Sequence, residues 1–213
     1  MSVAQTINQW SKAVPAWPLY VLGFVPAAWW IYLAVTNQFG AEPAIRLEHK
    51  LGLFALQLLL GSLLITPLRD WFKVNLIKYR RAIGLMAFYY VILHLAVYLF
   101  LDHQIQWIGW DAVIKDVTKR PYIMLGFLSL LVMVPLALTS NNWMIRKIGP
   151  FRWRMIHKAT YLIVLAGAAH FVMLKKTWQL EPILYFVLAF GLVAYRFWPK
   201  NGLRWLGRRN QTA

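Results

Sequence analysis

Six long apolar runs are the feature that most constrains the fold of this chain. Each approaches or exceeds the roughly 18–20 residues that a helix needs to cross a bilayer. Because a chain in lipid must satisfy its backbone hydrogen bonds internally, such runs predict α-helices. The expected spans are residues 19–36, 47–65, 82–101, 121–139, 156–174 and 182–198. The predicted fold class is therefore all-α, a polytopic integral membrane bundle of six helices. The segment 102–120 also has room for a short interfacial helix.

Composition excludes several classes of protein. Of the 213 residues, 60% are hydrophobic and only 14% are charged. Cysteine is absent, which excludes disulfide chemistry, iron–sulfur clusters and thiolate-ligated metals. The formal net charge of +16 lies mostly in short segments between apolar runs. Anionic lipid and the positive-inside rule explain this charge better than nucleic acid does, so no nucleic-acid partner is expected.

The distribution of lysine and arginine predicts the orientation of the spans. An even number of spans places both termini on one side. Sixteen of the 23 basic residues lie in the segments on that side, whereas Asp70 is the only one of the seven acidic residues there. The positive-inside rule then makes both termini cytoplasmic. We expect a cytoplasmic N-terminal segment (1–18), one transmembrane domain (19–198) and a basic cytoplasmic tail (199–213), with the first span an uncleaved anchor.

Two histidines lie at matched depth in different spans. His94 and His170 each come twelve residues after the cytoplasmic start of their span, taken at Ala82 and Lys158, which places both in the outer half of the bilayer. A polar side chain in hydrocarbon needs a partner, and a hydrogen bond to a neighbouring helix is the simplest one. A matched pair instead favours bis-imidazole ligation of a b-type haem. No Asp or Glu lies deep in a span, which argues against a carboxylate-based transporter.

His157 lies at the cytoplasmic threshold of the fifth span, thirteen residues before His170. At about 1.5 Å per residue the two are about 20 Å apart along a helix, so they cannot be the axial ligands of one iron. His157 is either a solvated interfacial residue or part of a second, inner cofactor site. The basic loops around it are topology signals, or a docking surface for an anionic flavin phosphate or a soluble reductase. His49 and His103 are predicted to be surface histidines.

Two segments of the chain resemble a known family. They read R-R-A-I-G-L-M-A-F-Y-Y-V-I-L-H-L-A-V-Y (80–98) and G-P-F-R-W-R-M-I-H-K-A-T-Y (149–161), and A-H-F (169–171) and T-P-L-R (66–69) extend the likeness. The chain is similar to the ferric-reductase-like transmembrane superfamily. Within it, the chain resembles the haem-binding membrane subunits of periplasmic methionine sulfoxide reductase systems. This resemblance implies that His94, His157 and His170 are associated with haem.

The resemblance also implies cofactors and partners. It implies a six-helix cytochrome b of the bacterial inner membrane that passes electrons to a periplasmic molybdopterin-containing methionine sulfoxide reductase. FMN is implied as a further cofactor, and a cytoplasmic flavin reductase or membrane quinol as the electron donor. Two-haem relatives carry a second histidine on the third span, where this chain has Arg80 and Arg81. A second haem at His157 therefore has no evident histidine partner, and without a G-x-G-x-x-G motif the chain needs a separate donor.

The predicted function is that of an electron-transfer subunit whose partner carries out the catalytic reduction. A quinol-oxidising or metal-reducing cytochrome b with another acceptor is the alternative within redox chemistry. A non-redox scaffold or permease is the alternative from another class. The predicted axial ligands are His94 and His170, with His157 the candidate for an inner FMN or second haem. The basic residues predicted to neutralise cofactor phosphate or propionate charge are Arg80, Arg81, Arg152 and Arg154.

Overall fold

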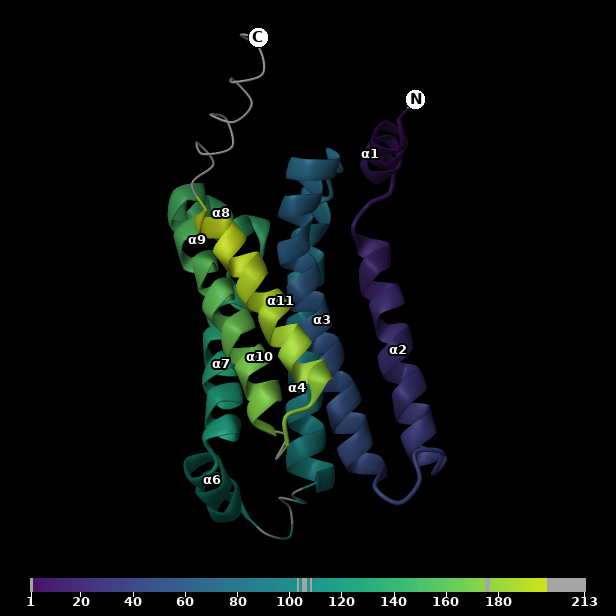
Figure 1. Cartoon of the computed structure of the whole chain (residues 1–213), viewed down its shortest axis with the longest axis vertical. Coiled ribbons are helices and arrows are strands. Elements are labelled where there is room, and N and C mark those ends of the chain that lie inside the picture. The colour runs from purple at the N-terminus through teal and green to yellow at the C-terminus, as the bar shows by residue number, and fades with distance from the viewer. Residues whose placement is uncertain (1, 103, 105–106, 108, 175–176, 199–213) are drawn as a thin grey trace.

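The computed structural model describes residues 2–102, 104, 107, 109–174 and 177–198, and its regular structure in these ranges is entirely helical. Six helical segments are long and apolar enough to cross a membrane (Figure 1). The chain is thus a multi-pass membrane protein, and the predicted six-helix fold is confirmed. His103 and the predicted tail 199–213 lie outside the described residues. The spanning helices are α2 (Trp17–Val35), α3 (Pro43–Phe72), α4 (Arg80–Val97) with its π-helical extension Tyr98–Asp102, α7 (Pro121–Leu138), α10 (Thr160–Leu174) and α11 (Leu180–Phe197).

Helix α3 extends beyond the predicted span at both ends. It begins at Pro43, where proline suits the first turn of a helix, and it continues through Pro67 to Phe72. The prediction that this span ends near Ile65 was wrong. Thr66 and Pro67 are buried in the bundle, and membrane helices tolerate proline where neighbouring elements pack around it. Lys73 ends the helix in the left-handed conformation, with φ of 61°.

Short helices occupy the ends of the spans. α6 (Trp110–Lys119) lies in the segment with room for an interfacial helix. No helix was predicted for the segments that form α1 (Val3–Ala13), α8 (Asn142–Ile148) and α9 (Pro150–Ile156). α1 begins with a capping box in which Ser2 and Gln5 satisfy each other's backbone N–H groups, so the S-x-x-Q pattern was a signal for this helix. α9 leads through a single 3-10 turn, His157–Ala159, into α10.

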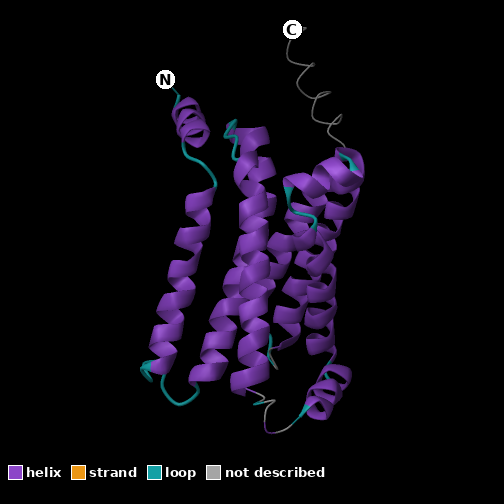
Figure 2. Cartoon of the chain, turned by 180° about the vertical axis from the view of Figure 1, so that it is seen from behind, coloured by secondary structure: helices purple, strands orange, loops and turns teal. Residues whose placement is uncertain are grey.

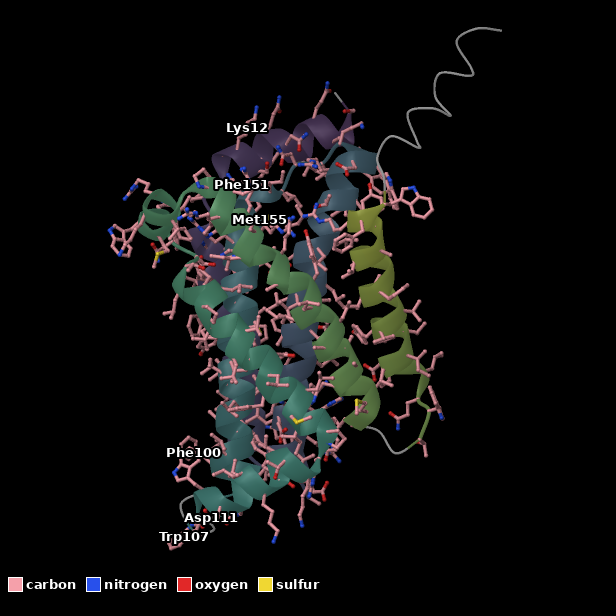
Figure 3. All side chains as sticks on the ribbon, turned by 90° about the vertical axis from the view of Figure 1, so that its left-hand side faces the viewer. Lys12, Phe100, Trp107, Asp111, Phe151 and Met155 are labelled. Carbon is pink, nitrogen blue, oxygen red and sulfur yellow. The ribbon has the colours of Figure 1, made fainter. Side chains whose placement is uncertain are left out.

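The bundle has two distinct ends. We call the end with α1, α8, α9 and the C-terminal end of α11 the basic end, and the opposite end the α6 end (Figure 1). Lys12 and Phe151 mark the basic end, whereas Phe100, Trp107 and Asp111 mark the α6 end (Figure 3). The first and last described helices thus reach the same end, as an even number of spans requires. That this end faces the cytoplasm stays a prediction.

Helix α3 is the centre of the packing. It contacts α2, α4, α10 and α11, while α7 packs against α10 and α4. α2 lies at the edge of the bundle (Figure 2). The hydroxyl of the buried Tyr90 on α4 donates to the carbonyl of Gly23 and accepts from the N–H of Ala27, which attaches α2 to α4. Because α4 and α10 both pack on α3, the two histidine-bearing helices belong to one packed core.

Candidate cofactor site

His94 of α4 and His170 of α10 meet inside the bundle. Their ring centroids are 6.4 Å apart, and the ring planes cross at 84°. Two imidazoles that bind one metal ion, each through a nitrogen about 2 Å from it, have ring centres roughly 6 Å apart. The structure therefore brings together the two residues predicted as axial ligands, at a separation that fits a single iron between them.

Each ring is oriented by a backbone carbonyl of a neighbouring helix. The Nδ1 of His94 lies 2.9 Å from the carbonyl oxygen of Glu48 on α3. The Nδ1 of His170 lies 2.6 Å from the carbonyl oxygen of Tyr122 on α7. A carbonyl can only accept, so Nδ1 must carry the proton in both rings. The unprotonated Nε2 is then available to a metal, which is the usual arrangement around a metal-bound histidine.

A glycine lies beneath each ring. A Cβ added to Gly52 of α3 would lie 3.0 Å from Nδ1 of His94, and one added to Gly126 of α7 would lie 3.1 Å from Nδ1 of His170. Each glycine follows by four residues the residue whose carbonyl holds the same ring. The two halves of the site therefore share one design, in which a helix offers a carbonyl to the imidazole and a glycine makes room for it.

The histidine pair lines a cavity of about 1000 Å³ between α3, α4, α6, α7 and α10. This volume is at the upper end of the ~300–1,000 Å³ typical of small-molecule sites. Most of its wall is apolar, with side chains such as Leu56, Val91 and Met133. Among the described residues, no group of three or more His, Cys, Asp or Glu could hold a bare metal ion. The size, the apolar wall and the paired imidazoles fit a flat, largely apolar macrocycle that brings its own iron.

Charged and polar side chains gather where the cavity approaches α6. Arg120 donates through Nε to the carboxylate of Asp116 at 2.6 Å and through Nη1 to the hydroxyl of Tyr122 at 3.1 Å. The hydrogen bond to Tyr122 raises the pKa of Arg120, which is therefore a permanent cation at this rim. The hydroxyl of Tyr98 donates to the other oxygen of Asp116, at 2.9 Å. The rim thus offers a cation within reach of a carboxylate-bearing ligand.

Sequence reasoning missed two residues of this cavity. His49, predicted to be a surface residue, is partly buried, lines the cavity, and lies 5.6 Å from Phe171 between ring centroids. Glu48 also lines the cavity, and its Oε1 lies 3.8 Å from Nε2 of His94. Both sit at the outer end of the second predicted span, in the same half of the bilayer as His94 and His170. That shared half was the sequence signal that could have placed them near the histidine pair.

His157 lies apart from this cavity and has partners of its own. Its Nε2 lies 3.1 Å from the hydroxyl oxygen of Thr139 at the end of α7, and its ring stacks on Trp153 at 4.0 Å between centroids. Arg80 is partly buried and close enough to His157 to act on it electrostatically. The other three described histidines line the cavity at the far level, so His157 has no histidine partner among the described residues.

The remaining predicted basic residues do not gather around His157 as a buried group. Arg81 is exposed, and its Nη1 donates to the side-chain oxygen of Asn142 on α8 at 2.6 Å. Arg152 and Arg154 are exposed on α9. Of the four arginines predicted at an inner site, the structure therefore brings Arg80 alone into a partly buried position beside His157.

Comparison with known proteins places this architecture in a family. A family model described as "Ferric reductase like transmembrane component" matches residues 49–168. The protein-methionine-sulfoxide reductase heme-binding subunits MsrQ of Brucella ovis, Brucella canis and Brucella abortus are each 47% identical to the chain over 180 residues, covering 84% of the chain and 80% of each relative. The chain belongs to the MsrQ family. No solved structure matches the chain.

Membership of the MsrQ family agrees with the resemblance seen in the sequence. The segment matched by the ferric reductase model contains His49, His94 and His157, whereas His170 lies two residues beyond its end. The position of His170 in the site therefore rests on the geometry of α10 and on the carbonyl that orients its ring.

Proposed function

We propose that this protein is a haem b electron-transfer subunit of the bacterial inner membrane, with His94 and His170 as the axial ligands of one haem iron. The observation that carries the proposal is that a backbone carbonyl holds Nδ1 of each ring in the same way. This arrangement leaves both Nε2 atoms unprotonated, and the 6.4 Å between the ring centroids suits one metal ion between the rings. The names of the MsrQ relatives, which describe heme-binding subunits, support the same cofactor.

A haem bound here would supply one-electron redox chemistry, and the chain would tune and position it. The carbonyls of Glu48 and Tyr122 fix the tautomer of each imidazole and increase its basicity as a ligand. The largely apolar wall would lower the dielectric constant around the ligand pair. Arg120 at the rim is placed to neutralise a propionate, since its guanidinium remains half exposed.

The proposed direction of electron transfer runs from the basic end to the α6 end. The excess of Lys and Arg at the basic end favours a cytoplasmic location and the docking of an anionic donor. We take the donor to be a cytoplasmic flavin reductase or membrane quinol, with FMN near Arg80 and His157 as an inner carrier. The acceptor would be a periplasmic molybdopterin-containing protein-methionine-sulfoxide reductase. The names of the relatives support a protein-methionine-sulfoxide reductase as the partner. That partner would carry out the catalytic reduction.

Reduced-minus-oxidised absorption spectra of the purified protein test the cofactor assignment directly. A b-type Soret band that shifts on dithionite reduction is expected from the wild type, with its intensity greatly reduced in His94→Ala and His170→Ala. His49→Ala serves as a control, because it removes a histidine of the same cavity that is not proposed as a ligand. A colourless wild-type preparation would exclude the electron-transfer proposal and favour a non-redox scaffold or permease.

The acceptor needs a separate test. A quinol-oxidising or metal-reducing cytochrome b with another acceptor would have the same haem spectrum. Deletion of the protein from a cell that also carries the periplasmic reductase should abolish reduction of oxidised methionine in periplasmic proteins. Unchanged methionine sulfoxide reduction in the deletion strain would favour the alternative acceptor.

A further inference from the structure

Three arginines from three different spans converge at the basic end. Arg69 lies in the last turn of α3, Arg80 in the first turn of α4, and Arg196 in the last turn of α11. Tyr161, at the start of α10, lies between two of them: the guanidinium carbon of Arg196 is 5.8 Å from the centroid of its ring, and Arg80 is a polar neighbour of its hydroxyl. We call Arg69, Arg80, Arg196 and Tyr161 the arginine cluster.

Arg196 has a donor that the described protein leaves unused. Its Nε is buried, and it has no hydrogen-bond partner among the described residues. Buried polar groups in proteins are almost always hydrogen-bonded, so an unpaired guanidinium N–H requires an explanation. Residues 199–213, which follow Arg196 in sequence, contain no Asp or Glu, so their side chains offer this cation no opposite charge.

The position of Arg80 adds a second reason to expect an anion. A cation in the last turn of a helix is stabilised by the helix dipole, which accounts for Arg69 and Arg196 without a ligand. Arg80 is in the first turn of α4, where the dipole disfavours a cation and where no acidic residue is present. It is partly buried and lies within electrostatic range of both Arg196 and Arg69. An anion bound between these side chains would offset both the unfavourable helix dipole at Arg80 and its repulsion by Arg196 and Arg69.

The chain supplies too little negative charge to neutralise the cluster itself. Asp70 is the only acidic residue assigned to this end of the chain. Its carboxylate is held by Arg69, with 3.0 Å between Nη2 and Oδ1, and by the hydroxyl of Tyr195, at 3.2 Å from Oδ2. Of the three arginines, all of them described residues, only Arg69 forms an ion pair with this carboxylate. A phosphate group, with several acceptor oxygens, is the anion that guanidinium groups bind best.

We propose that Arg196, Arg80 and the Tyr161 hydroxyl form a binding site for the phosphate group of an anionic ligand. The proposal deepens the proposed function, on which it rests for the cytoplasmic location of the site. The phosphate can belong to a soluble phosphate ester such as FMN or to the headgroup of an anionic phospholipid. The site differs from the one predicted from sequence, because Arg196 and Tyr161 take the place of Arg81, Arg152 and Arg154.

Binding measurements on Arg196→Gln and Arg80→Gln test the proposal in two arms. In the first arm, FMN is titrated into purified full-length protein and its fluorescence quenching is recorded, with riboflavin as the matched ligand that lacks the phosphate. In the second arm, native mass spectrometry counts the phosphatidylglycerol molecules that remain bound after purification. Arg146→Gln is the control variant, because Arg146 is an exposed arginine at the same end, on α8.

The phosphate site predicts a loss of roughly tenfold or more in FMN affinity for both glutamine variants, since each removes a charge-assisted hydrogen bond to the ligand. Riboflavin should bind with unchanged affinity, and Arg146→Gln should behave as the wild type. If the ligand is a lipid, the same variants instead retain less phosphatidylglycerol. Wild-type behaviour of Arg196→Gln in both arms would overturn the proposal.

A further variant distinguishes loss of the phosphate site from misfolding, and the Soret band distinguishes failure of this proposal from failure of the proposed function. Tyr161→Phe keeps the ring under Arg196 and removes only the hydroxyl, so a several-fold loss of phosphate-ligand binding is expected even if Arg196→Gln does not fold. Equal binding by Tyr161→Phe and the wild type in both arms would contradict the site. The Soret band, recorded on every sample, reports on the distant histidine pair. Absence of the Soret band would contradict the haem assignment, whereas the phosphate-binding measurements would remain valid.

Discussion

Replacement of Gly52 by alanine should weaken haem binding although it changes no proposed ligand. The added Cβ would lie 3.0 Å from Nδ1 and 3.1 Å from Cε1 of His94. Carbon atoms in favourable contact are about 3.5–4.0 Å apart, so the imidazole must move by a few tenths of an ångström. Metal–ligand distances tolerate only about 0.2 Å of error. The movement would also strain the 2.9 Å contact between Nδ1 and the carbonyl of Glu48.

The expected magnitude is that of losing an outer-shell partner of a metal ligand. Such changes typically cost 10- to 100-fold in metal affinity, or about 1.4–2.8 kcal/mol. Titration of haemin into the apoprotein, followed at the Soret maximum, measures this affinity. Gly61→Ala in the same helix is the matched control, because a Cβ there meets nothing within 4 Å.

The control also removes the effect of helix propensity. Alanine stabilises a helix over glycine by roughly 0.5–1 kcal/mol at either position, so only the contact with His94 distinguishes the two variants. Gly61→Ala should bind haem as the wild type does. Equal haem affinity for Gly52→Ala and Gly61→Ala would refute the reasoning that the ring of His94 is packed on the glycine while it holds the iron.

Two further predictions concern other parts of the bundle. Tyr90→Phe removes the buried hydroxyl that bonds to Gly23 and Ala27 of α2, so it should lower the free energy of unfolding by about 1–3 kcal/mol. The thermal unfolding midpoint in detergent measures this loss, with Tyr89→Phe as the control. Equal midpoints for the two variants would count against the hydrogen bonds of Tyr90. His157→Ala should keep the haem held by the other histidine pair but lose the inner carrier, measured by quantifying haem and flavin. Full content of both cofactors in this variant would contradict a role for His157.

The spans could be predicted from sequence because the thickness of a bilayer fixes the length of an apolar helix. Hydropathy does not fix in the same way where each helix begins and ends. Proline disfavours helical conformation in the residue before it, which would end the second span before Pro67. Helix α3 nevertheless continues to Phe72, because Thr66 and Pro67 are packed in the core. The short helices α8 and α9 lie in a basic segment whose composition resembles an ordinary loop.

The candidate site could likewise be predicted only in part. Counting residues from the start of each span gives the depth of His94 and His170, and depth alone was enough to pair them. The direction in which each side chain points depends on how the helices are rotated, since successive residues differ by about 100°. The carbonyls that hold the rings and the contact of Gly52 with His94 therefore became visible only once the helices were packed. The same limit hid the position of His49 in the cavity wall.

The separation of charge along the bundle leads to a last prediction. Fourteen residues of one helix separate Arg80 from His94, or about 21 Å at 1.5 Å per residue, so an electron that enters at the basic end needs an intermediate carrier or a long transfer. Sixteen basic residues and one acidic residue are assigned to that end, against seven and six at the other. An anionic donor should therefore be steered electrostatically to the basic end, whereas the acceptor meets a nearly neutral surface.

This asymmetry predicts that the two half-reactions differ strongly in their sensitivity to salt. Raising the salt from about 0.05 to 0.5 M shortens the Debye length from roughly 14 Å to 4 Å, which should slow reduction of the haem by a flavin reductase about tenfold or more. Reoxidation by the periplasmic partner should change much less. Stopped-flow absorbance at the Soret maximum measures both rates on the same preparation. A reduction rate that does not change with salt, or a reoxidation rate that changes more, would show that the basic end orients the protein in the membrane without recruiting its donor.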